Sequence, residues 1–323
     1  MNKNLIPKNL MDFEKKFNSE ETCVEYIVLL KFPEGYKCVC GHNKYWIRKK
    51  YYFRCLKCRV EHSILTDTIF EYSKKPLMLY FRAIWYIVSQ KNGSNAMNIQ
   101  RILGLGSYNT AWAWLQKLRR SMVRLDSPKL SGTVEVDETL VGGPGSGERK
   151  RGRGSNKLLV VIGAEIKTTI VEEEKTKIEI GRIKMQYIED ASSDSLHPFI
   201  QENIDTGSTL ITDDWNGYCG IETKGYFREI HKSKKDDDEL EHIHLIASLL
   251  KRWLLGTMQG SFSKKYIDYY LDEFAFRFNR RKSKDRGLLF YRLMEIAISR
   301  PSTTIKEIKK EQVPTKEAPV SKS

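Results

Sequence analysis

Two aspartates, Asp137 and Asp213, lie in sequence contexts where an acidic residue needs an explanation. Asp137 falls inside the β-rich run TVEVDET, and Asp213 is the first of the two aspartates at the end of the run STLITDD. An ionised carboxylate in such apolar surroundings is costly unless a cation pairs with it. If the two predicted strands lie side by side, their carboxylates meet at one point of a sheet. Mg²⁺ and Mn²⁺ prefer such oxygen ligands, and two ions there could activate water or a 3′-hydroxyl for attack on a phosphodiester.

A third ligand is expected from the helical run EHIHLIASLLKRW, which is amphipathic in an unusual way. At 3.6 residues per turn, one narrow arc of this helix contains the polar residues Glu241, His244, Ser248 and Lys251. The opposite side is apolar and contains Ile243, Ile246, Leu250 and Trp253. A ligand from the polar arc would complete the metal pocket, and Lys251 could hold a phosphate. Without the two aspartates, a simply solvated helix face would be the better interpretation.

Four of the six cysteines lie within 21 positions and predict a zinc site rather than disulfides. These residues are Cys38, Cys40, Cys55 and Cys58. The C-x-x-C turn is typical of zinc knuckles, whereas strand geometry would point the first two sulfurs to one side without a knuckle. His42 or His62 could replace one ligand, and the alternative is a relic site whose cysteines only pack.

The pattern becomes helical between Lys74 and Leu125. A short helix, a glycine-containing turn and a second helix with Ser107 as its N-cap are typical of a helix-turn-helix. The second helix would offer Tyr108, Asn109 and Thr110 to base edges, and Trp112 and Trp114 would pack between helices. Phosphate contacts are expected from Lys117, Arg119 and Arg120.

After Ser127 the sequence alternates strands and helices, and their order predicts an α/β fold with an RNase H-like mixed sheet and flanking helices. Five segments follow from these patterns. They are an N-terminal helical segment at 1–35, a zinc ribbon at 36–72, a helix-turn-helix at 73–126, an RNase H-like catalytic domain at 127–300 and a disordered tail at 301–323.

The net charge of +14 and the pI near 9.3 indicate a polyanionic partner, and nucleic acid is the natural one. A basic loop, PGSGERKRGRGSNK, separates the first two strands of the catalytic domain and is expected to contact phosphates. The full set of expected DNA contacts is Tyr108, Asn109, Lys117, Arg119, Arg120, Arg151, Arg153, Arg252, Arg280 and Arg281. No apolar run is long enough for a membrane span, so a cytoplasmic protein is expected.

Several long motifs, in order, resemble one family. They are VEVDETLVGG, GRGSNK, ITDDWNGY, HIHLIASLLKRWLLGTMQG and YYLDEFAFRFNRRKSKDRGLLFYRL. The sequence from about Tyr36 to Leu293 is similar to the ISXO-like insertion-sequence transposases, bacterial DDE enzymes related to Merlin elements. The resemblance implies that Asp137 and Asp213 are the first two catalytic residues. It places the third at His244, seven positions before Lys251, so that Mg²⁺ would lie at Asp137, Asp213 and His244. Glu241, one turn earlier, is the alternative because Mg²⁺ prefers oxygen ligands.

The resemblance further implies a transposase that binds double-stranded DNA, both the terminal inverted repeats of its element and the target, and that cleaves and transfers strands with Mg²⁺ or Mn²⁺. A homodimer or larger assembly associated with the nucleoid would bring two element ends together. Two alternatives are a catalytically inactive DNA-binding protein derived from a transposase, and a structure-selective nuclease that needs no particular end sequence.

Overall fold

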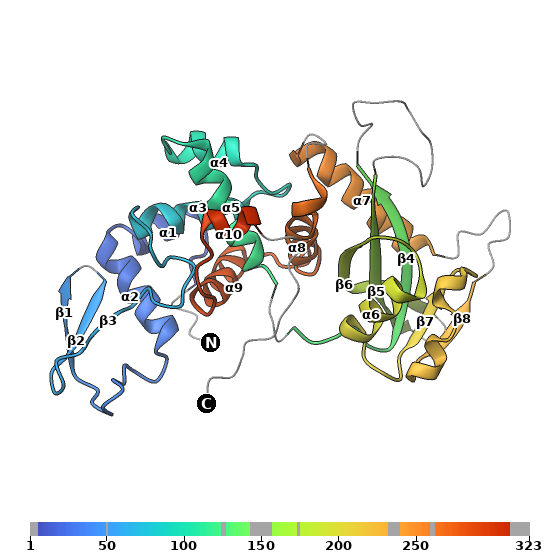
Figure 1. Ribbon diagram of the computed structural model, residues 1–323, viewed down its shortest axis with the longest axis horizontal. Coiled ribbons are helices and arrows are strands. Elements are labelled where there is room, and N and C mark those ends of the chain that lie inside the picture. Colours follow the sequence, from blue (N-terminus) through green and yellow to red (C-terminus); the bar gives the residue numbers. More distant parts are fainter. Residues whose placement is uncertain are drawn as a thin grey trace. The chain divides into compact units, whose positions relative to one another are not determined.

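The computed structural model describes residues 6–49, 51–123, 127–142, 157–172, 175–231, 240–258 and 262–310. They form two compact units, whose elements are labelled in Figure 1. The first unit contains the described residues up to 123 together with 283–310, and the second contains those within 127–282. No helix in the described part of the chain has the length and apolar character needed to cross a bilayer.

The first unit is mainly helical and also carries a small antiparallel sheet of order β1-β2-β3. Its interior is aromatic, and the Phe290 ring lies 5.5–6.0 Å from the rings of Phe13, Phe17, Phe81 and Trp85. The elements are α1 (Leu10–Lys16), α2 (Glu20–Lys31), β1 (Tyr45–Lys49), β2 (Tyr52–Cys55), β3 (Glu61–Ser63), α3 (Leu77–Ser89), α4 (Ala96–Leu103), α5 (Tyr108–Arg120), α9 (Arg286–Ile298) and α10 (Ile305–Lys310).

Local sequence explains the boundaries of α4 and α5. The Asn95 side chain accepts the Asn98 N–H and caps α4, and Gly104 ends that helix with a left-handed φ of 60°. Ser107 occupies the N-cap position of α5 as predicted, although its hydroxyl makes no capping hydrogen bond. A short helix, a tight turn and a second helix therefore lie where the sequence predicts them.

Two C-terminal segments differ from the prediction. Helix α9, which the sequence assigns to the catalytic domain at 127–300, belongs to the first unit because Phe290 lies in its aromatic interior. Gly287 approaches the Pro7 backbone so closely that a Cβ atom would lie 1.7 Å from the Pro7 oxygen. Residues Ile305–Lys310, expected in a disordered tail, form α10 because Ile308 is fully buried.

The second unit is built on a five-stranded mixed sheet of order β6-β5-β4-β7-β8. Strands β6, β5 and β4 are antiparallel neighbours, whereas β7 and β8 run parallel to β4. The sheet confirms the predicted mixed α/β class. The strands are β4 (Thr133–Val141), β5 (Leu158–Glu172), β6 (Lys175–Ile188), β7 (Thr209–Thr212) and β8 (Phe227–Ile230), and the helices are α6 (Ser193–Asn203), η3 (Asn216–Tyr218), η4 (Ile221–Lys224), α7 (Glu241–Met258), η5 (Lys264–Tyr266) and α8 (Ile267–Phe278).

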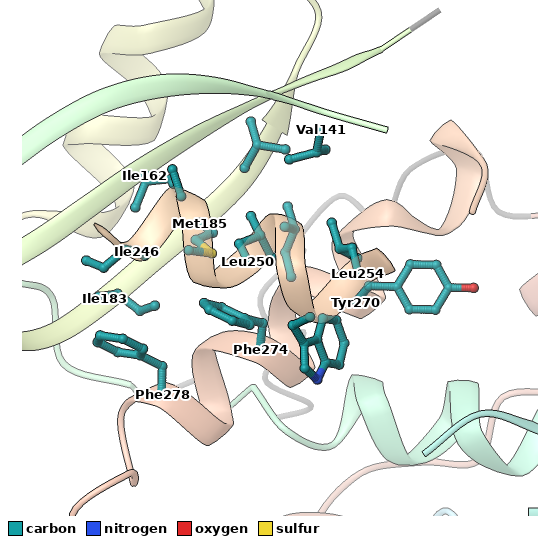
Figure 2. Close-up of a cluster of buried hydrophobic side chains, with 14 of the residues drawn as sticks. Val141, Ile162, Ile183, Met185, Ile246, Leu250, Leu254, Tyr270, Phe274 and Phe278 are labelled. Atoms are coloured by element: carbon teal, nitrogen blue, oxygen red, sulfur yellow. The ribbon is translucent and has the colours of Figure 1, made fainter. Parts of the chain in front are cut away.

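Both faces of this sheet are covered, and each face has its own buried cluster. Val134 and Val136 of β4 pack on the α6 side with Phe199. On the other side, α7 and α8 pack against β5 and β6 through the cluster drawn in Figure 2, which includes Ile246 and Leu250. The predicted apolar side of α7 is thereby confirmed, because Ile243, Ile246, Leu250 and Trp253 are all buried.

Helix α8 and the turn after it also protect the free edge of β6. The Asn279 side chain accepts the Ile183 N–H at 2.7 Å and donates to the Ile183 carbonyl at 3.0 Å, as a neighbouring strand would. Asp268 accepts the Tyr187 N–H, and Arg281 donates to the Gly181 carbonyl. These contacts satisfy edge groups that would otherwise be open to pairing with another chain.

Candidate active site and cysteine cluster

The strand register brings Asp137 and Asp213 to neighbouring positions. Thr133 pairs with Thr209 and Glu135 with Ile211 in the parallel pairing of β4 and β7. Continuing this register by two residues puts Asp137 beside Asp213, which directly follows β7. Burial raises the pKa of Asp137, and the nearby charge of Asp213 raises it further. Bringing a cation to this place would relieve the repulsion between the two carboxylates.

Helix α7 adds an imidazole to the two carboxylates. The His244 Nε2 atom lies 3.5 Å from Asp137 Oδ2, and both side chains are partly open to solvent. The Glu241 carboxylate is 72% exposed and its recorded contact is with His242 Nε2 at 3.7 Å. The structure therefore brings His244, rather than Glu241, to Asp137. Lys251 is exposed further along the same helix.

The carboxylate and imidazole groups are more widely spaced than the ligands of a formed metal site. Among the residues that the structure describes, only the four clustered cysteines place three or more ligand atoms within 4.8 Å of one another. Asp213 Oδ1 accepts the Trp215 N–H at 3.1 Å, so one of its oxygens is engaged by its own loop. Rotation of the aspartate and histidine side chains would be needed to close them on one ion.

The buried carboxylate of Glu135 fixes α7 in this position. Glu135 is 3% exposed, and its Oε2 accepts the Ile243 N–H at 3.0 Å while its Oε1 lies 2.8 Å from His242 Nδ1. A carboxylate at a helix N-terminus satisfies an otherwise open N–H and interacts favourably with the helix dipole. Glu135 precedes Asp137 by two residues, just as His242 precedes His244, so this anchor sets which helix residue meets Asp137. The sequence analysis did not identify Glu135.

Arg228 of β8 braces the loop that carries Asp213. Its Nη2 donates to the carbonyls of Asp213 at 2.9 Å and Trp215 at 3.3 Å, and its Nε donates to Thr212 Oγ1 at 3.0 Å. The guanidinium also lies 5.6 Å from the centre of the Tyr218 ring. The planar fork of arginine suits such simultaneous contacts. Arg228, too, was not identified from the sequence.

Glu138 belongs to the opposite side of the sheet, as the strand alternation predicts. Tyr218, which packs in the cluster beneath α6, is near enough to Glu138 to favour the ionised form of this carboxyl and so to lower its pKa. Burial dominates nevertheless and, with the charges of Asp137 and Asp213, raises the pKa of Glu138 to about 7. We assign no metal to this residue.

The four predicted zinc ligands form a compact cluster. Their sulfur atoms all lie within 4.8 Å of one another, with Cys38 at 3.5 Å from Cys58 and Cys40 at 3.7 Å from Cys55. Zn–S bonds of about 2.3 Å in a tetrahedron place the sulfurs roughly 3.8 Å apart, so the spacing fits zinc. Burial opposes ionisation of Cys55, but the N–H groups of Cys58 and Lys57, together with the side chains of Cys58 and Cys40, lower its pKa to about 6.

The first cysteine pair differs from the strand geometry expected of it. Cys38 begins a turn that contains Cys40 and in which the Gly41 N–H donates to the Cys38 carbonyl at 2.8 Å. Gly41 has a φ of 78°, which suits glycine. The turn folds both sulfurs toward Cys55 and Cys58, and His62 Nε2 lies 3.8 Å from Cys38 Sγ beside the cluster.

The predicted DNA contacts on α5 divide into exposed and engaged residues. Tyr108 and Asn109 are exposed at the start of the helix. The prediction that Arg119 contacts DNA is wrong, because this residue is 2% exposed and donates to the Ser94 carbonyl inside the first unit. Lys117 and Arg120 donate to Ser302 and Thr303 respectively, and burial lowers the pKa of Lys117. Trp114 packs against Tyr80 with ring centres 3.7 Å apart, as expected of a core residue.

The other predicted DNA contacts lie in the second unit. Arg252 is exposed on α7. Arg280 stacks over Phe276 and Arg281 over Phe278. Arg280 also donates to the Phe276 carbonyl, and Arg281 donates to the Gly181 carbonyl at the β6 edge. Arg151 and Arg153 lie outside the described residues.

The second unit thus defines a class of protein: a mixed α/β domain that gathers aspartates from adjoining parallel strands beneath a helix bearing an imidazole. Residues 129–279 match the family model of the ISXO2-like transposase domain. The match confirms, for this part of the chain, the resemblance found in the sequence. A search of curated proteins returned no match.

Proposed function

We propose that the protein is the transposase of a bacterial insertion sequence, which binds the ends of its element and catalyses DNA cleavage and strand transfer with a divalent metal. One observation supports this most directly. Within the segment that matches the transposase family, Asp137 lies beside Asp213 by strand register and 3.5 Å from His244. The second unit would then be an RNase H-like domain of the DDE type.

In this proposal Asp137, Asp213 and His244 hold the catalytic cation, and Lys251 binds a phosphate of the DNA. A bound Mg²⁺ or Mn²⁺ would polarise the phosphodiester and help to activate the attacking hydroxyl. The carboxylates supply the oxygen ligands that both ions accept, and the imidazole shifts the preference toward Mn²⁺. Water would attack first and the released 3′-hydroxyl second, with no covalent bond between protein and DNA.

The first unit would recognise DNA. We propose that the cysteine cluster holds a structural zinc ion in a ribbon, and that α4 and α5 act as a helix-turn-helix with Tyr108 and Asn109 toward the bases. Arg252 would contact DNA beside the catalytic site. A homodimer or larger assembly on double-stranded DNA, in the cytoplasm at the nucleoid, follows from the need to join two element ends.

A strand-transfer assay with labelled element ends, in Mg²⁺ and in Mn²⁺, tests this function. Asp137→Asn should abolish cleavage and transfer while leaving end binding intact. Asp194→Asn is the matched control, because this exposed carboxylate on α6 lies outside the proposed site. End binding without cleavage by the parent protein would favour an inactive DNA-binding descendant, and cleavage of unrelated substrates would favour a nuclease.

The third ligand can be tested in the same assay. His244→Ala should abolish activity, and Glu241→Ala should preserve it. His244→Glu should raise activity in Mg²⁺ relative to Mn²⁺, because a carboxylate replaces the nitrogen ligand. A loss of activity in Glu241→Ala alone would reverse the assignment of these two residues.

A further inference from the structure

The small sheet of the first unit has one buried face and one exposed face of distinct character. Phe53 and Cys55 of β2 are 1% and 0% exposed, and they point to the buried face. Strand alternation puts Tyr52 and Arg54 on the opposite face, where Arg54 pairs with Trp46 of β1. We call the surface formed by Trp46, Arg48, Tyr52 and Arg54 the aromatic face.

Both rings of the aromatic face are open to solvent. Trp46 is 48% exposed and Tyr52 is 43% exposed, although Phe53 of the same sheet is buried. Arg48 reaches the same face, since it forms an ion pair with Glu61, the residue of β3 that pairs with Arg54. Large exposed rings set among arginines are typical of a binding surface rather than of packing.

The charge around this face indicates the kind of partner. Residues 36–63 contain eight Lys or Arg residues and a single acidic residue, Glu61, a formal excess of seven positive charges. Zinc bound to four thiolates would reduce this excess by only two. As a partner of this face, a polyanion is therefore favoured over a protein surface that is apolar or contains few acidic residues.

The rings further restrict which polyanion fits. In a duplex the faces of the bases are stacked on one another and hidden, so a ring on a sheet face can reach only base edges or backbone. Unpaired bases present their faces, and aromatic side chains with neighbouring cations are the usual means of binding them. We propose that the aromatic face binds single-stranded DNA, with unpaired bases stacking on Trp46 and Tyr52 and phosphates contacting the surrounding Lys and Arg.

This inference rests on the proposed function only for the presence of DNA. Unpaired bases would occur beside a cleaved or frayed element end, so the face would hold a strand near its terminus. The face lies in the first unit and uses none of the residues proposed for catalysis.

Binding of the full-length protein to a fluorescent oligothymidine and to a duplex of equal length tests the proposal. Trp46→Ala and Tyr52→Ala should each weaken single-strand binding roughly 5- to 150-fold, the usual effect of losing one stacked base. Duplex binding should change much less. Tyr72→Ala is the matched control, because this tyrosine of the same unit is 80% exposed and belongs to none of the three strands of the small sheet.

Trp46→Phe and Tyr52→Phe keep a ring and should retain most of the single-strand affinity, and zinc content reports whether each variant is folded. Unchanged single-strand affinity in both alanine variants would overturn the proposal, as would equal losses on single strands and duplex. Loss of self-association without loss of DNA binding would instead identify a protein-binding face. The Asp137→Asn protein should bind the oligothymidine normally, so failure of the catalytic proposal and failure of this one are distinguishable.

Discussion

Replacing Glu135 with alanine should loosen the first turn of α7 from β4 and displace His244 from Asp137. The substitution removes a buried carboxylate that accepts the Ile243 N–H and contacts His242 Nδ1. The N–H would be left buried without an acceptor, because water cannot easily reach an anchor that is 3% exposed.

The magnitude follows from these two contacts. An unsatisfied buried donor costs about 1–3 kcal/mol, and a hydrogen bond to a charged group contributes about 1.5–3 kcal/mol. Allowing for partial relaxation, we expect Glu135→Ala to lower the free energy of unfolding of the second unit by about 2–4 kcal/mol. For a unit of this size that is a fall of roughly 5–15 °C in the unfolding temperature. Glu135→Gln keeps one acceptor for the Ile243 N–H and should lose less.

Glu165→Ala supplies the matched control. Glu165 is also 3% exposed, but it binds Arg182 and the Ser131 N–H instead of α7. Both variants should be destabilised to a similar extent. Only Glu135→Ala should accelerate hydrogen exchange at the Ile243 amide and weaken Mn²⁺ binding, by roughly tenfold, as expected for a residue that supports a ligand. Identical exchange and Mn²⁺ affinity in the two variants would refute the anchoring role of Glu135.

Three further outcomes are expected. Arg228→Met should weaken Mn²⁺ binding roughly tenfold in titrations by freeing the Asp213 loop, and Arg228→Lys should recover part of it; equal affinity in all three proteins would contradict the brace. Glu165→Gln should make the free energy of unfolding depend less on pH in the acid range, which urea unfolding from pH 7 to 3 would measure. Burial tends to raise the pKa of Glu165, but Arg182 holds this pKa below its usual value. The stabilisation by the Glu165 carboxylate is therefore present above about pH 4.5 and is lost as pH falls through the lowered pKa. Cys55→Ser should lose the bound zinc that metal analysis finds in the parent, and a parent without zinc would contradict the cysteine site.

The mixed α/β class and most helix and strand positions could be predicted from the sequence. Alternation and helical periodicity are local properties, and they identified β4 and β7 as strands and α7 as a helix with the correct buried side. The placement of α9 could not be predicted in this way. Its apolar residues fit any core, and only the aromatic interior around Phe13 and Phe17 determines which unit it joins.

The predicted catalytic residues came from strand and helix patterns together with the family resemblance, whereas the residues that position them were missed. Glu135 and Arg228 look like ordinary solvent-facing charges in short strands. Their roles depend on partners 108 and 15 residues away in the chain. A usable signal did exist for Arg119, which follows Leu115 by four residues and so falls on the buried side of α5.

The inward orientation of the α5 cations changes where DNA affinity must arise. With Arg119 buried and Lys117 and Arg120 bound to the C-terminal segment, the exposed start of α5 offers mainly the uncharged Tyr108 and Asn109. Such residues can discriminate bases but contribute little to counterion release, which sets the strength of phosphate binding. In the first unit, the densest cationic segment is the one around the cysteine cluster. Selectivity for base sequence would therefore reside in α5, and most of the affinity for phosphates in the segment around the cysteine cluster. The two contributions should differ in salt dependence, because only phosphate binding by cations releases counterions.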